Sequence, residues 1–243
     1  MPKLTDAIKH LIIINVIMFV APLLLKMDLT NLFALHLPEN EHFGVWQYIT
    51  SMFMHGGSMH LIFNMYALWA FGTPLEQMWG KNKFLFFYFS AGIGAGLIYT
   101  FVNYYQFNGI YEIFSNAGLN SSEILSILDA GKTSDLRLNG VLTQEQFSKI
   151  VNLYHTPAVG ASGAIYGVLV AFAISFPDAK LAMIFFPVPI ASKYFIPLII
   201  LSDLFFGLTK YSVGNIAHFA HIGGAIIGFI IAWYWKKNQF KVF

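Results

Sequence analysis

The chain has 243 residues, of which 57% are hydrophobic, 17% aromatic and only 11% charged. Soluble domains carry about 25% charged residues, so this composition excludes an ordinary soluble globule. The sequence contains no cysteine, which excludes disulfides, thiolate metal sites and a cysteine nucleophile, and a net charge of +2 without a basic patch gives no sign of nucleic-acid binding. Apolar runs of about 17 or more residues recur along the chain and predict an all-α membrane protein.

The first predicted membrane span covers residues 9–25, and its flank lacks the small-residue cleavage site of a signal peptide. Residues 26–57 follow as a connector that is too long for a simple turn. Its aromatic residues Trp46 and Tyr48 are typical of a membrane interface, so we expect the connector to lie partly there.

The second predicted span, residues 58–78, carries polar residues at one of its ends. His60 and Asn64 are four residues apart and therefore share one helix face. Polar groups at membrane depth are functional candidates by default, although an interhelical hydrogen bond is the simpler alternative. Glu76, at the other end of the span, is expected to be a structural charge rather than a catalytic acid.

The third predicted span covers residues 83–105 and is followed by a more polar stretch at 107–156. Five of the 12 acidic and three of the 14 basic residues lie in this stretch. We expect an extramembrane insertion that leans on the bundle, with short amphipathic helices at 121–128 and 143–153 that begin with capping residues.

One segment of the insertion superficially resembles a calcium-binding loop. Asp135 begins the segment, but Arg137 occupies a ligand position and Gln146 stands where a bidentate acid is needed. We therefore reject a calcium site.

The fourth predicted span, residues 161–177, begins at a serine that is surrounded by small residues. Ser162 is suited to a helix N-terminus, where unpaired N–H groups point outward. Gly160, Gly163 and Gly167 recur three and four residues apart, which predicts a bare helix face that another backbone can approach closely. Taken without the rest of the chain, the serine is either a packing residue or a nucleophile beside an anion site.

Residues 179–193 are expected to form an extended interfacial connector, and 194–209 the fifth span. Asp203 is an acid within this span for which the sequence indicates no partner. A hydrogen bond near the helix end is the expected role of its carboxylate, in preference to a catalytic one.

The sixth predicted span covers residues 213–235. By helical periodicity His221, Gly224 and Gly228 share one face, so the histidine interrupts a stripe of small residues. Packing of this stripe against the bare face of the fourth span would bring His221 near the serine at position 162. His218 lies about one turn earlier and more to the side.

Three motifs together resemble those of the rhomboid intramembrane serine proteases. They are GxSG at the start of the fourth span, HxxxxHxxxN at the entry to the second and AHxxGxxxG in the sixth, and they occur in the family's order. The resemblance covers nearly all of the chain except the insertion. It implies a six-transmembrane-helix rhomboid-like bundle in a single membrane domain, residues 1–243, with an extramembrane insertion between the third and fourth spans.

By this resemblance Ser162 is the nucleophile and His221 the general base of a dyad. His60, Asn64 and the Ser162 backbone N–H match the oxyanion-stabilising donors, and Tyr166 matches the tyrosine that packs against the catalytic histidine. In a dyad no third carboxylate is needed, because Tyr166 and the glycine contact would hold the imidazole. The supporting positions are Tyr166, Gly160, Gly163, Gly224, Gly228, His55 and His218.

The first loop departs from the family pattern. The family's Trp-Arg dipeptide is replaced by Trp46-Gln47, so the anchoring of this loop and its lipid contacts are not defined by the resemblance.

The resemblance implies no metal and no cofactor. The expected partners are single-span transmembrane protein substrates and membrane lipid, with no nucleic acid. Nine of the 14 basic residues fall on one side of the predicted spans, so the positive-inside rule places both termini in the cytoplasm of a multi-pass protein of the cell membrane.

Two other functions compete with a protease. One is a catalytically silent rhomboid-like protein that binds membrane clients, although such proteins lack the serine or the histidine. The other is a transporter or channel that uses His60, Asn64, His218 and His221 as a proton relay. Helix-breaking pairs in matching halves, which would support a transporter, are absent from the sequence.

Overall fold

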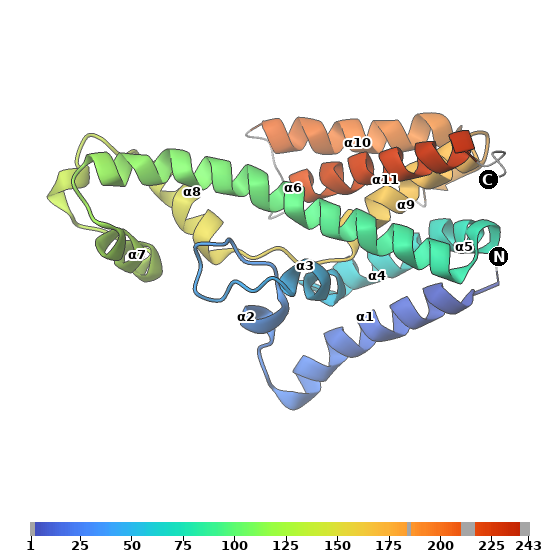
Figure 1. The fold of residues 1–243 in the computed structure, drawn as a ribbon, viewed down its shortest axis with the longest axis horizontal. Helices are drawn as coiled ribbons and strands as arrows, with labels where there is room; N and C mark the ends of the chain where they lie inside the picture. Colours follow the sequence, from blue (N-terminus) through green and yellow to red (C-terminus); the bar gives the residue numbers. More distant parts are fainter. Residues whose placement is uncertain (1–2, 184–185, 210–216, 239–243) are drawn as a thin grey trace.

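The computed structural model describes residues 3–183, 186–209 and 217–238, and its fold is mainly helical (Figure 1). The helices are α1 Asp6–Leu25, α2 Thr30–Phe33, α3 Gln47–Thr50, α4 Ser58–Ala67, α5 Thr73–Trp79, α6 Lys81–Asn116, α7 Ser121–Ala130, α8 Gln144–His155, α9 Ser162–Ser175, α10 Ser192–Leu208 and α11 His218–Asn238, with 3₁₀ turns η1 Ser51–Phe53 and η3 Leu136–Leu138, the π-helical segment η2 Leu68–Gly72, and strands β1 Lys180–Met183 and β2 Phe186–Ala191.

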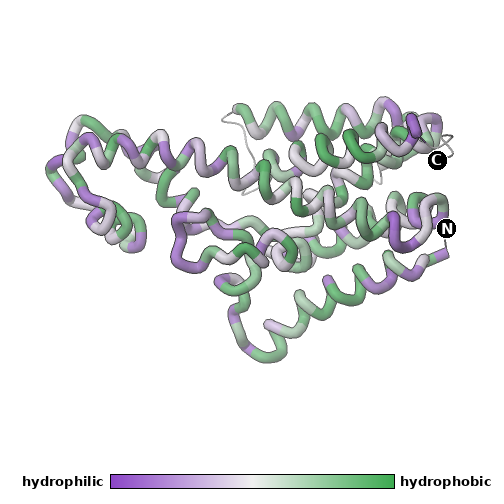
Figure 2. Tube along the Cα trace, in the orientation of Figure 1, coloured by the Kyte–Doolittle hydropathy of each residue, from purple (hydrophilic) through white to green (hydrophobic). Residues whose placement is uncertain are grey.

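Helices α1 and α10 and the N-terminal half of α6 are largely apolar, whereas polar residues recur along the C-terminal half of α6 (Figure 2). Among the described residues, α1, α6 and α11 are long and apolar enough to cross a membrane, and α9 is a shorter apolar helix. Large hydrophobic side chains are exposed along α1, α10 and α11, as lipid-facing surfaces require. The crossing of a membrane by the segments 58–79, α9 and α10 stays a prediction from the sequence.

Glu76 on α5 caps the N-terminus of α1 through hydrogen bonds. The backbone N–H groups of Ala7 and Ile8 donate to its two carboxylate oxygens at 2.8 and 3.0 Å, and the hydroxyl of Thr5 donates to the same carboxylate. The first N–H groups of a helix have no partner within the helix, and its positive end favours an anion. Glu76 therefore has the structural role expected for it, and ties the first helix to the second predicted span.

Helix α6 is longer than the predicted third span, which ended at residue 105. It continues without interruption to Asn116, so the first ten residues of the stretch 107–156 belong to this helix (Figure 1). A helix of 36 residues is about 54 Å long, whereas a hydrocarbon core is about 30 Å thick. Helix α6 is therefore longer than a hydrocarbon core is thick.

The far end of α6 carries a second hydrophobic core. Its buried members are Leu37, Phe107, Ile110, Phe114, Leu119, Ile124, Leu128, Leu138, Ile150 and Tyr154. Most of these side chains come from α6, α7 and α8. Both short helices begin with a capping box: Thr143 caps α8 as predicted, whereas α7 is capped by Asn120, one residue before the predicted Ser121. The polar stretch is thus a packed unit built on the C-terminal extension of α6, and it contains the two short helices that the sequence predicts.

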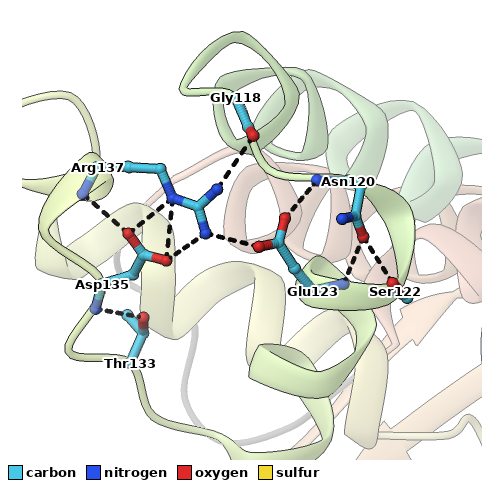
Figure 3. A network of polar contacts seen from close by, with 7 residues as sticks. All are labelled: Gly118, Asn120, Ser122, Glu123, Thr133, Asp135 and Arg137. Atoms are coloured by element: carbon cyan, nitrogen blue, oxygen red, sulfur yellow. Dashed lines mark hydrogen bonds and ion pairs between the residues drawn. The ribbon is translucent and has the colours of Figure 1, made fainter.

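Arg137 links the segments of this unit (Figure 3). Its guanidinium donates to Asp135 at 2.7 Å, to Glu123 at 2.9 Å and to the carbonyl of Gly118 at 3.1 Å. Hydrogen bonds from Arg137 lower the pKa of both carboxyl groups below their ordinary values. Asp135, the first residue of the apparent calcium loop, is thus already paired with a cation.

We expect Arg137→Gln to lower the hydrogen-exchange protection of α7 by a few-fold at pH 7, because such exposed pairs contribute little each. Since the folded pKa values of Glu123 and Asp135 are lowered, their stabilisation is present above the unfolded values and is lost as the pH falls below about 4. The difference in hydrogen-exchange protection of α7 between the variant and the wild type should therefore decrease at low pH. Lys132→Gln, at an exposed position in the same unit, is the control, and an equal loss there would contradict the account.

Gln47 anchors the first loop in place of the family's arginine. Its side chain is fully buried; the amide nitrogen donates to the carbonyls of His42 at 2.7 Å and Asn31 at 3.2 Å, and the amide oxygen accepts from the backbone N–H of His36 at 3.1 Å. A buried amide that satisfies three backbone groups holds them in one arrangement. The neutral residue therefore supplies the anchoring that the motif comparison left undefined.

The connector after α9 is extended over its described residues, as predicted, and its two strands also pair with each other. Strands β1 and β2 form an antiparallel pair in which Lys180 faces Ala191 and Leu181 faces Ile190. Helix α10 follows directly from Ser192, two residues before the predicted start of the fifth span. Residues 213–216 of the predicted sixth span lie outside the described residues, and α11 continues to Asn238.

Candidate active site

Ser162 is the first residue of α9 and is positioned by the backbone that precedes it. Leu35 and Ala158 exchange two backbone hydrogen bonds, at 2.9 and 2.8 Å, and the N–H of Gly160 donates to the carbonyl of Ser51 at 2.9 Å. These bonds fix the approach of the chain to the helix start. The N-terminus of α9, with its unpaired N–H groups, is thereby held beside the first loop.

Gly160 is required for a different reason than the sequence suggested. It precedes the helix and is not part of its bare face, because α9 begins at Ser162. Its φ of +127° disfavours any L side chain, and a Cβ there would lie 2.9 Å from the ring of His60. The small-residue face of α9 therefore consists of Gly163 and Gly167, and Gly160 instead makes room for His60.

The bare faces of α9 and α11 are in backbone contact. A methyl group at Gly224 would overlap the carbonyl of Gly163, and one at Gly228 would overlap Gly167. A Cβ at Gly167 would in turn lie 3.0 Å from the carbonyl oxygen of Gly224. This close approach is the one predicted from the two stripes of small residues, and it sets the distance between the side chains at the end of the interface.

Ser162 and His221 face each other at that end. The hydroxyl oxygen of Ser162 lies 2.9 Å from Nε2 of His221. Tyr166, one turn after the serine, stacks on the imidazole with ring centroids 4.3 Å apart and an interplanar angle of 10°. A serine hydroxyl at hydrogen-bond distance from an imidazole is the arrangement by which a base activates a nucleophile.

Asp203 on α10 contacts both histidines of α11, which the sequence did not indicate. Its Oδ1 lies 3.2 Å from Nδ1 of His221 and 2.6 Å from Nδ1 of His218, and the hydroxyl of Tyr166 donates to its Oδ2. The expectation that Tyr166 and the glycine contact hold the imidazole without a carboxylate is therefore incomplete. The signal that could have found it is an acid within an apolar span, which is rare without a partner.

His60 and Asn64 line the same cavity as Ser162 and His221. Asn64 is buried, and its amide nitrogen donates to the carbonyl of His60 at 3.0 Å, which leaves the second amide hydrogen for another acceptor. The ring of His55 packs edge-on against that of His60, with the two ring centroids 5.0 Å apart. Burial and the neighbouring His60 lower the pKa of His55 to about 4, so this histidine is neutral at pH 7.

The cavity has a volume of about 2050 Å³ and extends beyond these residues. One wall is formed by α8, through Ser148, Lys149 and Asn152. Another is formed by apolar residues of α10, such as Phe195 and Ile199. The space beside Ser162 can therefore hold an extended peptide as well as water.

Comparison with known proteins gives one consistent family. A family model described as the Rhomboid domain matches residues 42–115 and 123–238. Similar proteins include the rhomboid protease AarA of Providencia stuartii, 29% identical over 200 residues, and the rhomboid protease GluP of Bacillus subtilis, 30% identical over 188 residues. Mitochondrial rhomboid protein 1 of Saccharomyces cerevisiae is 28% identical over 191 residues.

These alignments cover 77%, 77% and 78% of this chain and 54%, 25% and 41% of the respective relatives. The chain thus spans about half or less of the length of these proteins.

Proposed function

Because this chain belongs to the rhomboid family, we propose that it is an intramembrane serine endopeptidase that cleaves transmembrane segments of other proteins. The observation that carries the proposal is the 2.9 Å separation between the Ser162 hydroxyl and Nε2 of His221. The two bacterial relatives are named as rhomboid proteases, which supports the same activity.

The proposed reaction proceeds in two halves. In the first, the oxygen of Ser162 attacks the scissile carbonyl carbon while its proton passes to Nε2 of His221. The carbon–nitrogen bond then breaks, and the imidazolium returns the proton to the leaving amine. In the second half, a water molecule gives a proton to His221 while its oxygen attacks the acyl carbon. The bond between this carbon and the Ser162 oxygen then breaks, and the imidazolium returns the proton to that oxygen, which restores the hydroxyl. The cavity beside the serine supports the access of water that this step requires.

The oxyanion of the tetrahedral intermediate would be held by the backbone N–H of Ser162 and by the side chains of His60 and Asn64. The N–H lies at the start of α9, where the positive end of the helix favours negative charge. His60 and Asn64 line the same cavity as the serine, which supports this assignment.

Asn64→Ala tests the contribution of one such donor. Loss of a single oxyanion donor costs about 2.7–4 kcal/mol, so we expect kcat to fall by about 10²–10³-fold without loss of the protein's fold. Initial rates on a transmembrane substrate measure this, with Asn103→Ala as a control, because Asn103 is an asparagine that lines the same cavity from α6 rather than from α4. If Asn64→Ala kept the wild-type kcat, the role of Asn64 as an oxyanion donor would be contradicted.

The proposed topology has six spans, formed by residues 9–25, 58–78, 83–105, 161–177, 194–209 and 213–235. We propose that both termini are cytoplasmic, because nine of the 14 basic residues fall on one side of these spans. The start of α1 and the end of α11 lie at the same end of the molecule, away from α7 and α8 (Figure 1), which supports this orientation. The substrates we propose are single-span proteins of the cell membrane.

Labelling with a fluorophosphonate tests the proposal without a known substrate. An active serine protease forms an adduct with this reagent, whereas a catalytically silent family member that binds membrane clients does not. We expect an adduct in the wild type that is absent in Ser162→Ala. Absence of labelling in the wild type, together with retained binding of transmembrane proteins, would favour the silent alternative.

A further inference from the structure

We propose that Asp203 is a positioning residue for the catalytic base, so that Ser162, His221 and Asp203 act as a triad built from three helices. The proposal deepens the proposed protease function and rests on it. It is carried by the carboxylate oxygen Oδ1, which lies 3.2 Å from Nδ1 of His221, while Nε2 of the same ring faces the serine at 2.9 Å.

The position of this carboxylate decides which ring nitrogen carries the proton. A neutral imidazole has one N–H and one lone pair, and the partner of one nitrogen sets the state of the other. A carboxylate accepts hydrogen bonds and cannot donate one. Beside Asp203, Nδ1 of His221 must therefore carry the proton, which leaves the lone pair of Nε2 directed at the hydroxyl of Ser162. The negative charge also stabilises the imidazolium that forms after proton transfer.

The carboxylate itself is held from two further directions. Nδ1 of His218 lies 2.6 Å from Oδ1, and the hydroxyl of Tyr166 donates to Oδ2. The side chain of Asp203 is only 10% exposed, and those of His218 and His221 are 7% and 12% exposed. Hydrogen bonds in such a surrounding are strong and cooperative, so the carboxylate is preorganised. Tyr166 thus has two roles: it stacks on His221 and fixes the residue that orients the imidazole.

The same three side chains could be considered as a metal site, because their ligand atoms lie within 4.8 Å of one another. Two ligands on a tetrahedral zinc ion are about 3.3 Å apart, as bonds of about 2.0 Å require. The 2.6 Å between Oδ1 of Asp203 and Nδ1 of His218 is shorter than this and is typical of a charge-assisted hydrogen bond. The geometry therefore favours hydrogen bonds over a bound ion.

Asp203→Asn removes the charge and keeps the shape. We expect kcat for a transmembrane substrate to fall by about 10²–10⁴-fold, in the range that follows loss of the aspartate charge in other serine proteases. KM should stay near the wild-type value, because Asp203 does not line the cavity. Ser202→Ala, at the exposed neighbouring position on α10, is the matched control and should keep wild-type kcat. Unchanged kcat in Asp203→Asn, or a loss confined to KM, would overturn the proposal.

A spectroscopic measurement on the wild-type protein covers the case in which the variant fails to fold. The ¹⁵N resonances of His221 distinguish a protonated Nδ1 from a protonated Nε2, and we expect the proton on Nδ1 at neutral pH. A proton on Nε2 would overturn the role of Asp203. If instead the wild type shows no Ser162-dependent labelling or cleavage, the protease function fails, and the ¹⁵N spectrum still reports on the contact separately.

Discussion

Replacement of His221 by alanine is expected to abolish cleavage, with kcat reduced by about 10⁴–10⁶-fold. Nε2 of the imidazole lies 2.9 Å from the Ser162 oxygen. In a serine protease, removal of the catalytic histidine alone lowers kcat about as much as removal of all the catalytic residues together. Initial rates of substrate cleavage in proteoliposomes measure the loss, and fluorophosphonate labelling reports the same step without a substrate. The variant should retain its fold, because the stripe of glycines on α11 is unchanged.

His218→Ala is the matched comparison on the same helix. His218 contacts Asp203 and not the serine, so we expect it to reduce the labelling rate without abolishing it. If His218→Ala abolished labelling and His221→Ala preserved it, the assignment of the base would be reversed.

Gly224→Ala is expected to inactivate the protein from a position that does not line the cavity beside the serine. Its methyl group would overlap the carbonyl of Gly163, and neither backbone can yield without separating α9 from α11. A displacement of about 1 Å at a reacting pair costs about 10²-fold in rate, and overpacking destabilises by about 1–3 kcal/mol. We therefore expect a loss of at least about 10²-fold in kcat together with a lower melting temperature in detergent.

Gly109→Ala, in the interior of α6, controls for the substitution itself. A Cβ at Gly109 meets open space, so the change should be neutral or slightly stabilising. Wild-type activity in Gly224→Ala would show that the serine and the histidine do not depend on the close contact of the two helices.

The stripes of small residues show what the sequence could predict. Helical periodicity places Gly163 and Gly167 on one face of a span and Gly224 and Gly228 on another, and the structure packs these faces together. Periodicity alone could not separate Gly160 from the first stripe, because the start of α9 depends on backbone bonds to the first loop. A glycine that serves a positive φ and one that serves helix packing look alike in a sequence.

Asp203 and Gln47 show what the sequence could not predict. Each is a polar residue whose partners come from other segments, so its role depends on tertiary contacts that no local pattern encodes. Asp203 meets side chains of α9 and α11 from its place on α10, and Gln47 meets three backbone groups of the first loop. The length of α6 exceeds the predicted span for a related reason: residues 107–116 are polar enough to resemble the start of the insertion, whereas the buried face of this part of the helix carries Phe107, Ile110 and Phe114.

The most direct test of the central claim is cleavage of a single-span membrane protein in proteoliposomes by the wild type and by Ser162→Ala, with mass spectrometry of the fragments. We predict a cut within or at the edge of the transmembrane segment in the wild type and intact substrate with Ser162→Ala. Cleavage that persists in Ser162→Ala would contradict the assignment of the nucleophile.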